Sequence, residues 1–389
     1  MIPSELYEES KRENCVIFAG AGISTEGGSY GKPTFYERIK KECAFPSSEP
    51  NPSFPDLMQY YCDNKDGGKK NLLIRQIIDR IEWFSQDGEI NQSTSFAHRA
   101  IAMNPFYRIV VTTNWDPFFE RRLNILVPVV EDRDIPFWDD KKRQILKIHG
   151  CVTRPDTMVI TQNDYKKLIR FKKNNPVFTK LKDLMATKTF LFIGYSMEDP
   201  NIKTIFHDLS KILGDFSRLS YAVDPDPSKA TIAEWKKHGV QIIKASGYGF
   251  LRDINDRLIE EKMIPDPDMV DCFSSQLGRI FGIHIRDSEN QDDKFLSTMY
   301  QDGLIHEIEY IVSNSTYGIK IADLKVRLKE GKEILKKYER DEAKYRKEKT
   351  EEEKNRRTNA MIEIVYFTGR IEVLSRFLKG KMEPIPSDL

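Results

Sequence analysis

Short apolar runs that alternate with helical stretches constrain the fold of this chain more than any other feature of its sequence. The runs are rich in valine, isoleucine and phenylalanine, and each is bounded by Gly, Pro, Asn or Asp. They lie at residues 15–19, 108–112, 126–130, 145–148, 158–160, 189–193, 219–223 and 240–244. Stretches with helical periodicity, such as 201–213 and 228–238, separate most of them. Strands that alternate with helices predict a Rossmann-like α/β fold, with a mostly parallel sheet covered on both faces.

One long stretch interrupts this alternation after the first predicted strand. Between residues 33 and 103 no run indicates a strand, and helical segments are expected at 35–43, 71–85 and 96–103. Pro- and Gly-rich connections join these segments. We interpret the stretch as a helical module inserted between the first and second strands of the sheet.

A second change of character occurs after residue 262. We therefore expect residues 1–262 to form the α/β domain, and residues 263–389 to form a helical region that serves oligomerisation or partner docking. Within this region, residues 323–357 are rich in charge with a basic excess, which predicts a long, exposed helix with a thin apolar seam. Residues 364–378 predict a last helix with a much stronger apolar face.

Composition argues against several other classes of protein. The formal net charge is only +1 over 389 residues, which gives no basis for non-specific attraction to nucleic acid or membranes. No apolar run approaches the roughly 20 residues that span a bilayer, and the N-terminal MIPSELYEES lacks the apolar core of a signal peptide. The five cysteines are scattered and never spaced as Cys-x-x-Cys. We expect a cytoplasmic protein with no disulfide framework and no structural zinc site.

The first candidate site is a glycine loop directly after the first predicted strand. Gly20, Ala21 and Gly22 follow CVIFA and precede Ser24 and Thr25. Glycines at such a turn let the backbone approach a pyrophosphate, and amide groups at the start of the next helix face the anion. The spacing departs from G-x-G-x-x-G because Thr25 occupies the third position. A tight strand–helix turn without a ligand is the alternative interpretation.

Polar side chains follow two further predicted strands. Asn114 and Asp116 lie in TTNWD, and His149 lies in KIHG. An asparagine can donate to and accept from ribose hydroxyls, an aspartate can stabilise developing positive charge, and a histidine can accept a proton near neutral pH. The alternatives are a helix N-cap ahead of Pro117 for the first two residues and a packed core position for the histidine.

These motifs together resemble the sirtuin-like family. GAGIS at 20–24, TTNWD at 112–116, KIHG at 147–150 and GYS at 194–196 occur in the order and approximate spacing of sirtuins. Each motif ends a predicted strand, where open α/β sheets bind their ligands. The resemblance covers residues 12–250 and implies an NAD⁺-binding catalytic domain.

The resemblance implies a role for each matching residue at the reacting end of NAD⁺. Asn114 would bind the nicotinamide ribose, Asp116 would bind the nicotinamide amide, and His149 would act as the general base. Phe35 would cover the nicotinamide end of the site. His98 matches a structural histidine of sirtuins.

Further residues would hold the rest of the dinucleotide. The loop at 20–24 would bind the pyrophosphate, and Gly194 and Ser196 would contact the phosphate–ribose segment. Asp224 would bind the adenine ribose, as a carboxylate commonly does in Rossmann domains. Tyr195, inside GYS, would act as a lid or as a packing residue.

Two departures from the sirtuin pattern bear on the reaction. Deacylating sirtuins carry two Cys-x-x-Cys pairs after the histidine, whereas here only Cys151 is near His149 and the next cysteine is Cys272. A four-thiolate zinc site cannot be built from these residues, which argues against protein deacylation. Sirtuins also follow the phenylalanine with arginine, but Tyr36 follows Phe35 here, and we expect water to reach the site more easily.

Attack by water would convert NAD⁺ to nicotinamide and ADP-ribose. Zinc-free sirtuin-like proteins of bacterial antiphage systems have a similar layout of TTNWD, IHG, GYSMEDPNI and a helical C-terminal extension. The resemblance implies a metal-free NAD⁺ hydrolase that depletes NAD⁺ in defence, forms a homo-oligomer and pairs with a HerA-type ATPase. Nucleic acid would be reached only through that partner. The alternatives are a sensor of NAD⁺ or ADP-ribose, a deacylase or ADP-ribosyltransferase, and a nucleic-acid-binding scaffold.

Overall fold

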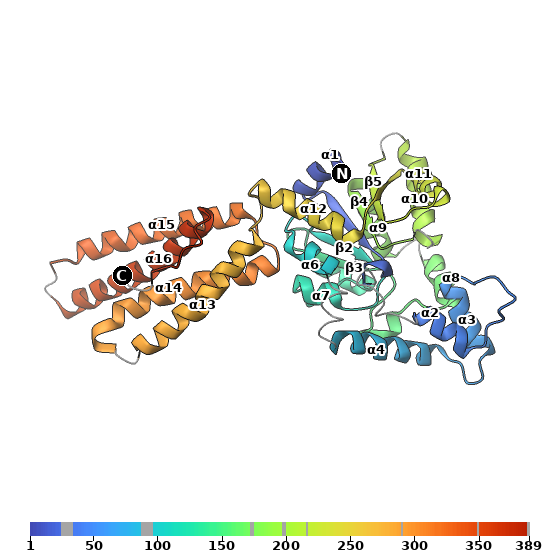
Figure 1. Ribbon diagram of the computed structural model, residues 1–389, viewed down its shortest axis with the longest axis horizontal. Helices are drawn as coiled ribbons and strands as arrows, with labels where there is room; N and C mark the ends of the chain where they lie inside the picture. Colours follow the sequence, from blue (N-terminus) through green and yellow to red (C-terminus); the bar gives the residue numbers. More distant parts are fainter. Residues whose placement is uncertain are drawn as a thin grey trace. The chain divides into compact units, whose positions relative to one another are not determined.

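The chain divides into an α/β unit and a helical unit (Figure 1). The α/β unit comprises Met1–Ala102 and Phe106–Ile254, and the helical unit comprises Met103–Pro105 and Asn255–Leu389. The computed structural model describes residues 1–24, 34–86, 96–171, 175–196, 200–214, 217–288, 291–347 and 350–386.

A six-stranded sheet in which every neighbouring pair is parallel forms the centre of the α/β unit. Its strands are β1 (Cys15–Ala19), β2 (Ile109–Thr112), β3 (Gln144–Lys147), β4 (Thr189–Ile193), β5 (Ser220–Asp224) and β6 (Val240–Lys244). The spatial order β3-β2-β1-β4-β5-β6 is that of the Rossmann fold, and the order reverses between β1 and β4. The predicted fold class is confirmed.

Helices connect these strands along the chain. The α-helices of this unit outside the insert are α1 (Ser4–Lys11), α7 (Phe118–Leu123), α8 (Gln162–Phe171), α9 (Pro176–Thr187), α10 (Pro200–Leu213), α11 (Lys229–Lys237) and α12 (Gly247–Glu260), whose last turns belong to the helical unit. Short 3₁₀ helices are η1 (Ala21–Ser24), η3 (Asp132–Phe137) and η4 (Pro155–Thr157). Figure 1 shows α9, α10 and α11 on one side of the strands and α1 and α6 on the other.

Strand β1 lies at the centre of the sheet and is covered on both faces. All of its residues are buried. Because side chains alternate along a strand, Val16 and Phe18 point to one face, where they join a core with α9, α10 and α11. Cys15 points to the other face, where burial raises its thiol pKa to about 12. This two-sided burial explains why the strand is a continuous apolar run rather than an alternating one.

Two of the predicted strands are wrong. The run at 126–130 joins the sheet only through a bridge from Val129 to Leu146. Pro128 has no backbone N–H to donate to a ladder, and Leu126 is 92% exposed. The run at 158–160 is apolar for a different reason, because two of its side chains are buried in the core of the helical insert.

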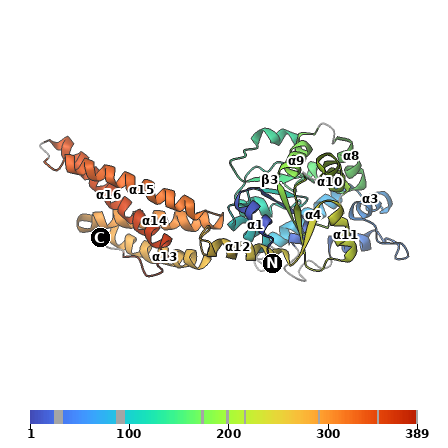
Figure 2. The same cartoon turned by 90° about the horizontal axis from the view of Figure 1, so that it is seen from above.

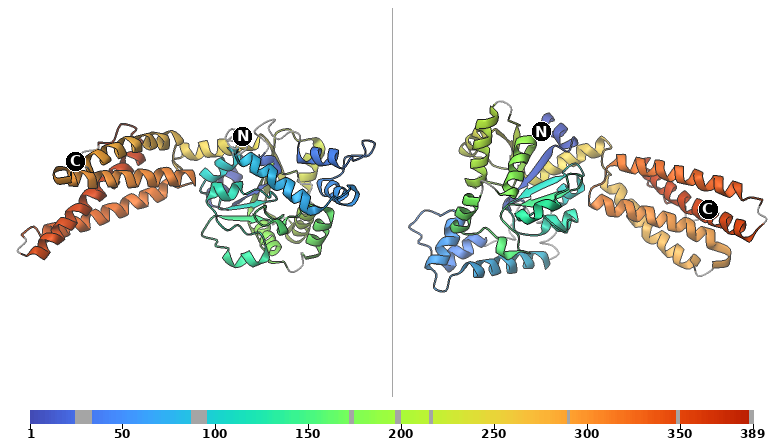
Figure 3. Two further views of the ribbon diagram at one scale, coloured as in Figure 1. Left: turned by 90° about the horizontal axis from the view of Figure 1, so that it is seen from below. Right: turned by 180° about the vertical axis from the view of Figure 1, so that it is seen from behind.

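The described residues between η1 and β2 form helices and no strand. These helices are α2 (Phe35–Glu42), α3 (Phe54–Asn64), α4 (Lys70–Gln86) and α6 (Phe96–Met103). Helix α3 begins within a stretch that was expected to be a connection, where Ser53 accepts a hydrogen bond from the Asp56 amide as an N-cap. Helices α2, α3 and α4 share one apolar core, beside which α8 packs against α3 (Figure 3).

Among the described residues of the helical unit, most belong to four long helices, which Figure 2 shows side by side. They are α13 (Pro267–Ser288), α14 (Gln291–Thr316), α15 (Ile321–Lys344) and α16 (Glu351–Leu378). Helix α14 packs against α13 and α16, and α16 packs also against α15. Gly303 and Gly369 let α14 and α16 approach closely, because a Cβ on Gly303 would collide with the Tyr366 carbonyl and one on Gly369 with the Tyr300 carbonyl.

The single long helix expected at 323–357 is wrong. Helix α15 ends at Lys344, and Thr350 starts α16 with a capping box in which its hydroxyl accepts from the Glu353 amide. The two helices then lie against each other as a hairpin. The apolar seam seen in the sequence is therefore shared by two helices. No helix among the described residues is both long and apolar enough to cross a membrane.

Candidate functional site

The carboxyl ends of β1 and β2 are tied together by side chains of the TTNWD motif. The Thr112 hydroxyl donates to the Ala19 carbonyl at 2.9 Å and accepts from the Asn114 amide N–H at 3.0 Å. The Asn114 side-chain amide then donates to the Gly20 carbonyl at 3.2 Å. The asparagine is therefore fixed against the glycine loop, and it does not cap the following helix.

Asn114 keeps an unused acceptor. The residue is only 7% exposed, and its side-chain oxygen is buried without a hydrogen-bond partner among the described residues. The Ser24 hydroxyl at the end of the glycine loop is in the same situation. A buried polar group left unsatisfied costs about 1–3 kcal/mol, so such groups are expected where a ligand completes the bonding.

Glycines bring the loops after β1 and β4 into backbone contact. The Gly22 amide donates to the Gly194 carbonyl at 2.9 Å, and Gly194 has a positive φ of 63°. A Cβ on Gly22 would lie 2.8 Å from the Gly194 Cα, and one on Gly20 would collide with the Gly194 carbonyl. This contact lies where the strand order reverses, the usual ligand crevice of such sheets. Thr25 lies outside the described residues.

Asp116 is buried at the start of α7. Its carboxylate accepts from the Phe118 amide at 3.1 Å, so one oxygen serves the beginning of the helix, as one alternative for this residue predicted. Burial raises the pKa of Asp116, and the Lys147 ammonium and the Phe118 amide oppose this rise.

His149 is buried beside two aromatic residues. Its backbone carbonyl accepts from the Trp115 indole at 3.0 Å and from the Val159 amide at 3.0 Å. Its imidazole Nδ1 lies 3.4 Å from the Tyr165 hydroxyl, and the two rings meet edge to face at 5.1 Å. The histidine is thus held between the end of β2 and α8.

Two functional candidates near the site were missed from the sequence. Tyr165 on α8 reaches His149 from a helix that has no motif of its own. Lys147, in KIHG, is fully buried, and its ammonium donates to Glu120 at 2.9 Å and to the Asp116 carbonyl. A lysine inside an apolar run is a signal that could have identified it, because a lysine is almost never fully buried without a partner.

Phe35 and its neighbour belong to the helical insert. The Phe35 ring packs at 6.3 Å from Phe54, whose ring in turn lies 5.8 Å from Trp115. This chain of rings links the insert to the TTNWD motif. The Tyr36 hydroxyl donates to the Pro52 carbonyl at 2.7 Å, so its polar end is used within the insert.

Packing accounts for two aromatic candidates. Tyr195 lies 4.7 Å from Phe18 in the core of the sheet, which favours a packing role over a lid. His98 is fully buried, with its ring 4.4 Å from Phe119 and 5.8 Å from Phe118. A structural role is the one that its surroundings favour.

Ser196 and Asp224 lie farther along the sheet. Ser196 is exposed after β4, and Asp224 ends β5, two positions from β1 in the strand order. The Asp224 carboxylate accepts from the Asp226 amide at 2.9 Å, which forms a turn. Both residues lie at the ligand edge of the sheet but outside the group around Asn114 and His149.

A metal site is not found in the part of the chain that the structure describes. No group of three or more His, Cys, Asp or Glu side chains there could hold an ion. Cys151 is buried and accepts from the Thr153 hydroxyl at 3.1 Å.

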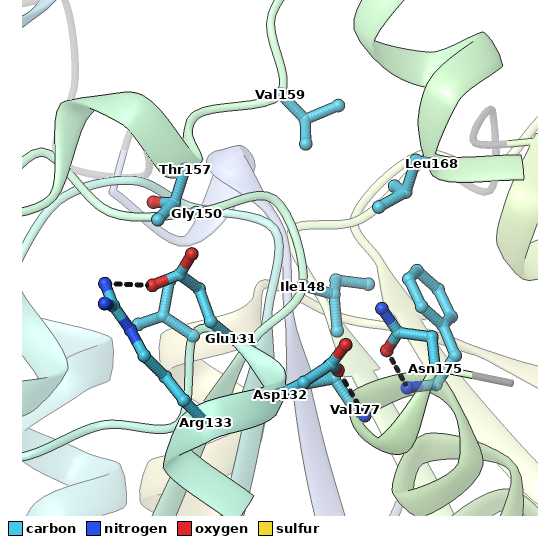
Figure 4. Close-up of a pocket in the computed structure, with 12 residues that line it drawn as sticks. Glu131, Asp132, Arg133, Ile148, Gly150, Thr157, Val159, Leu168, Asn175 and Val177 are labelled. Atoms are coloured by element: carbon cyan, nitrogen blue, oxygen red, sulfur yellow. Dashed lines mark hydrogen bonds and ion pairs between the residues drawn. The ribbon is translucent and has the colours of Figure 1, made fainter. Parts of the chain in front are cut away.

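A cavity of about 390 Å³ lies next to the end of β3 (Figure 4). Ile148 and Gly150, on either side of His149, form part of its wall. Its polar side chains are engaged within the protein, through Glu131 to Arg133, Asp132 to the Val177 amide, and Asn175 to the Phe178 amide. The Asn114 and His149 side chains do not line this cavity, so it is separate from the candidate site at the ends of β1 and β2.

Comparison with known proteins shows that part of this chain is similar to a SIR2-like domain. The SIR2-like domain family matches residues 108–243, which contain Asn114, Asp116 and His149. The resemblance inferred from the motifs is confirmed for this part of the chain.

Individual relatives are similar over part of their length. "NAD(+) hydrolase ThsA" of Bacillus cereus (strain MSX-D12) is 31% identical over 219 residues, which are 55% of this chain and 43% of that protein. The protein of the same name from Enterococcus faecium is 29% identical over 223 residues, 56% of this chain and 44% of that protein. "Defense-associated sirtuin 2" of Bacillus subtilis is 24% identical over 311 residues, 72% of this chain and 29% of that protein. The chain thus spans less than half the length of these relatives.

Proposed function

We propose that this chain, which carries a SIR2-like domain, is an NAD⁺ hydrolase that releases nicotinamide and ADP-ribose and acts in antiphage defence by depleting NAD⁺. Two kinds of observation support the proposal. Parallel strands in the Rossmann order end at one edge of the sheet, where the polar residues after β2 and β3 and the glycine loop after β1 lie. Relatives similar over more than half of this chain carry the name NAD(+) hydrolase.

The observation that carries the proposal is the state of Asn114. Its amide nitrogen is bonded to the glycine loop, while its buried side-chain oxygen lacks a partner among the described residues. An acceptor fixed in this way is suited to a ribose hydroxyl, whose hydrogen bond would satisfy it. The same hydrogen bond would position the ribose relative to the loop that is expected to hold the pyrophosphate.

The proposed reaction breaks the bond between ribose C1′ and the nicotinamide nitrogen. Nicotinamide leaves as a neutral molecule with the bonding electron pair, and positive charge develops on the ribose. Water attacks C1′ through its oxygen and gives up a proton to His149 as the general base. Asp116 supplies negative charge beside this centre, and Asn114 holds the ribose. The proposal assigns no step to a metal ion.

The proposal extends to the setting of the enzyme. We propose a cytoplasmic homo-oligomer, because the NAD⁺ pool that it would deplete is cytoplasmic and an unrestrained hydrolase would harm its own cell. A HerA-type ATPase is the proposed partner, on the resemblance to zinc-free defence sirtuins. Helices α13–α16 offer a separate helical unit for docking.

A nicotinamide-release assay tests the activity. Purified wild type, alone and with a HerA-type ATPase, should release nicotinamide from NAD⁺, and Asn114→Ala and His149→Ala should reduce release by at least about 100-fold, the scale of losing a general base. His207→Ala, at an exposed histidine on α10, is the matched control and should retain activity.

Three results would contradict parts of the proposal. Wild type that releases nothing under either condition excludes hydrolysis, and tight calorimetric binding of unchanged NAD⁺ would then identify a sensor. Full activity of both alanine variants would show that the catalytic site does not lie at the strand ends. Label transfer from tagged NAD⁺ to protein would indicate an ADP-ribosyltransferase instead.

A further inference from the structure

A buried ion pair between Lys147 and Glu120 lies next to the candidate site. Lys147, the last residue of β3, is 0% exposed, and its ammonium donates to Glu120 Oε1 at 2.9 Å. The same ammonium donates to the backbone carbonyl of Asp116. One side chain therefore joins β3, the loop after β2 and helix α7.

The pair lies in apolar surroundings. Strand β3 is buried along its whole length, and Lys147 lies between Leu146 and Ile148, both buried. A leucine or methionine could fill such a position, and replacing a buried ion pair by apolar residues is often neutral or stabilising. Filling space therefore does not account for the charge at this position.

The charges around Asp116 indicate what the lysine does. Lys147 approaches from β3, and Arg121 and Glu120 belong to α7. Burial raises the pKa of Asp116, and Lys147 is the largest opposing influence. Burial alone would lower the pKa of Lys147, but the carboxylates of Glu120 and Asp116 outweigh it, so the ammonium stays charged. The thiol of Cys151 lies on the Glu120 side of the pair, and His149 follows two residues after Lys147.

We infer that Lys147 and Glu120 are positioning residues for the reaction at this site: Glu120 holds the Lys147 ammonium in place, and Lys147 holds the loop that carries Asn114 and Asp116 and sets a positive charge near the Asp116 carboxylate. The inference rests on the proposed NAD⁺ hydrolysis, in which an anionic Asp116 stabilises positive charge on the ribose. Neither residue touches the reacting atoms in this assignment. Their influence reaches the site through the Asp116 carbonyl and through the field on its carboxylate.

The pH dependence of activity distinguishes this role from a purely structural one. If Asp116 must be ionised, kcat/KM falls as the pH drops through its pKa. Removing the ammonium in Lys147→Met raises that pKa, so the loss should begin at a pH higher by about one unit or more, with roughly tenfold less activity per unit below it. Lys147→Arg keeps the charge. The decline of kcat/KM at low pH, the acid limb of the profile, should therefore stay close to that of the wild type.

The partner carboxylate gives a test of opposite sign. Glu120→Gln keeps size and shape but removes the negative charge that Lys147 pairs with, which leaves the ammonium unpaired beside Asp116, so the acid limb of this variant should move to lower pH. A structural role would move both variants in the same direction, or would change only their thermal stability. In Asp116→Asn the limb should disappear, and adding Lys147→Met to that variant should cause no further shift.

The experiment measures nicotinamide release by the full chain from pH 5 to 9 for these variants, with circular dichroism as a folding control. A second readout, ¹³C NMR titration of the Asp116 carboxyl, reports its ionisation without any turnover. An unshifted carboxyl titration in Lys147→Met, or in Glu120→Gln if the first variant does not fold, overturns the inference. If the variants show the expected titration shifts but the wild type releases no nicotinamide, the proposed function is refuted while the effect on Asp116 ionisation stands.

Discussion

Substitution of Gly194 by alanine should separate the two loops that meet at the candidate ligand crevice. Gly194 has a φ of 63°, and a new Cβ would collide with the Ile23 amide and lie 2.6 Å from the Gly22 carbonyl carbon. The left-handed conformation costs an L-residue about 1–2 kcal/mol, and overpacking adds about 1–3 kcal/mol. Because the colliding atoms are backbone, the loops must move apart and the Gly22–Gly194 hydrogen bond must break.

A matched glycine isolates the collision from the backbone strain. Gly239 has a similar φ of 69°, but nothing lies within 4 Å of an added Cβ. Gly239→Ala should therefore lose only the conformational part, about 1–2 kcal/mol, and keep its affinity for NAD⁺. Gly20→Ala, whose Cβ would collide with the Gly194 carbonyl without the positive φ, should give the collision part alone.

The assay combines denaturant unfolding with calorimetric titration of NAD⁺. We expect Gly194→Ala to be less stable than Gly239→Ala by about 1–3 kcal/mol and to bind NAD⁺ at least about tenfold more weakly, since 1.4 kcal/mol corresponds to a factor of ten. Equal stability losses in the two variants, with unchanged affinity in Gly194→Ala, would refute the argument that the loop contact shapes the crevice.

Two further predictions concern single contacts. Tyr165→Phe keeps the ring beside His149 but removes the hydroxyl 3.4 Å from Nδ1, so kcat for nicotinamide release should fall about two- to tenfold, the effect of one hydrogen bond, with no additional loss in a His149→Ala background. Gly303→Ala should lower the melting temperature of the helical unit, because its Cβ would collide with the Tyr366 carbonyl. Gly278→Ala has open space around the added Cβ and should be neutral or stabilising by up to about 1 kcal/mol. A melting temperature raised by Gly303→Ala would contradict the close packing of α14 and α16.

The sheet could be predicted because its strands carry local signals. The run at β1 is apolar without alternation and ends in glycine, as a central parallel strand requires. The two wrongly predicted strands share a physical cause. An apolar run indicates that its side chains are buried, but it does not indicate which element they pack against. The run at 158–160 is buried against helices of the insert, and Pro128 removes a donor from the other false strand.

The sequence carries a local signal for the helix break after Lys344. Thr350 followed by Glu353 is the signature of a capping box, and both of its hydrogen bonds are present. The dense charge pattern on both sides hid this signal, because charged residues favour helix on either side of a break. Intrinsic propensity alone could not place the turn.

Only part of the candidate site could be predicted from the sequence, namely the residues of motifs that directly follow a strand. Asn114 and His149 follow β2 and β3, so the parallel order brings them to one edge. Tyr165 reaches His149 from α8, and Glu120 reaches Lys147 from α7. Both contacts depend on how helices dock on the sheet, which no local pattern in one sequence specifies.

The two halves of the site are stabilised by different forces, and this difference should separate binding from cleavage. The β1–β4 half is backbone against backbone, with Gly22 and Gly194 in contact, and nothing in that contact titrates. The β2–β3 half depends on the ammonium of Lys147 and the carboxylate of Asp116, whose interaction changes with protonation. Changes in the glycine half should therefore raise KM at every pH. Changes in the charged half should lower kcat with a dependence on pH, because in the proposed reaction charge develops on the ribose only as the glycosidic bond breaks.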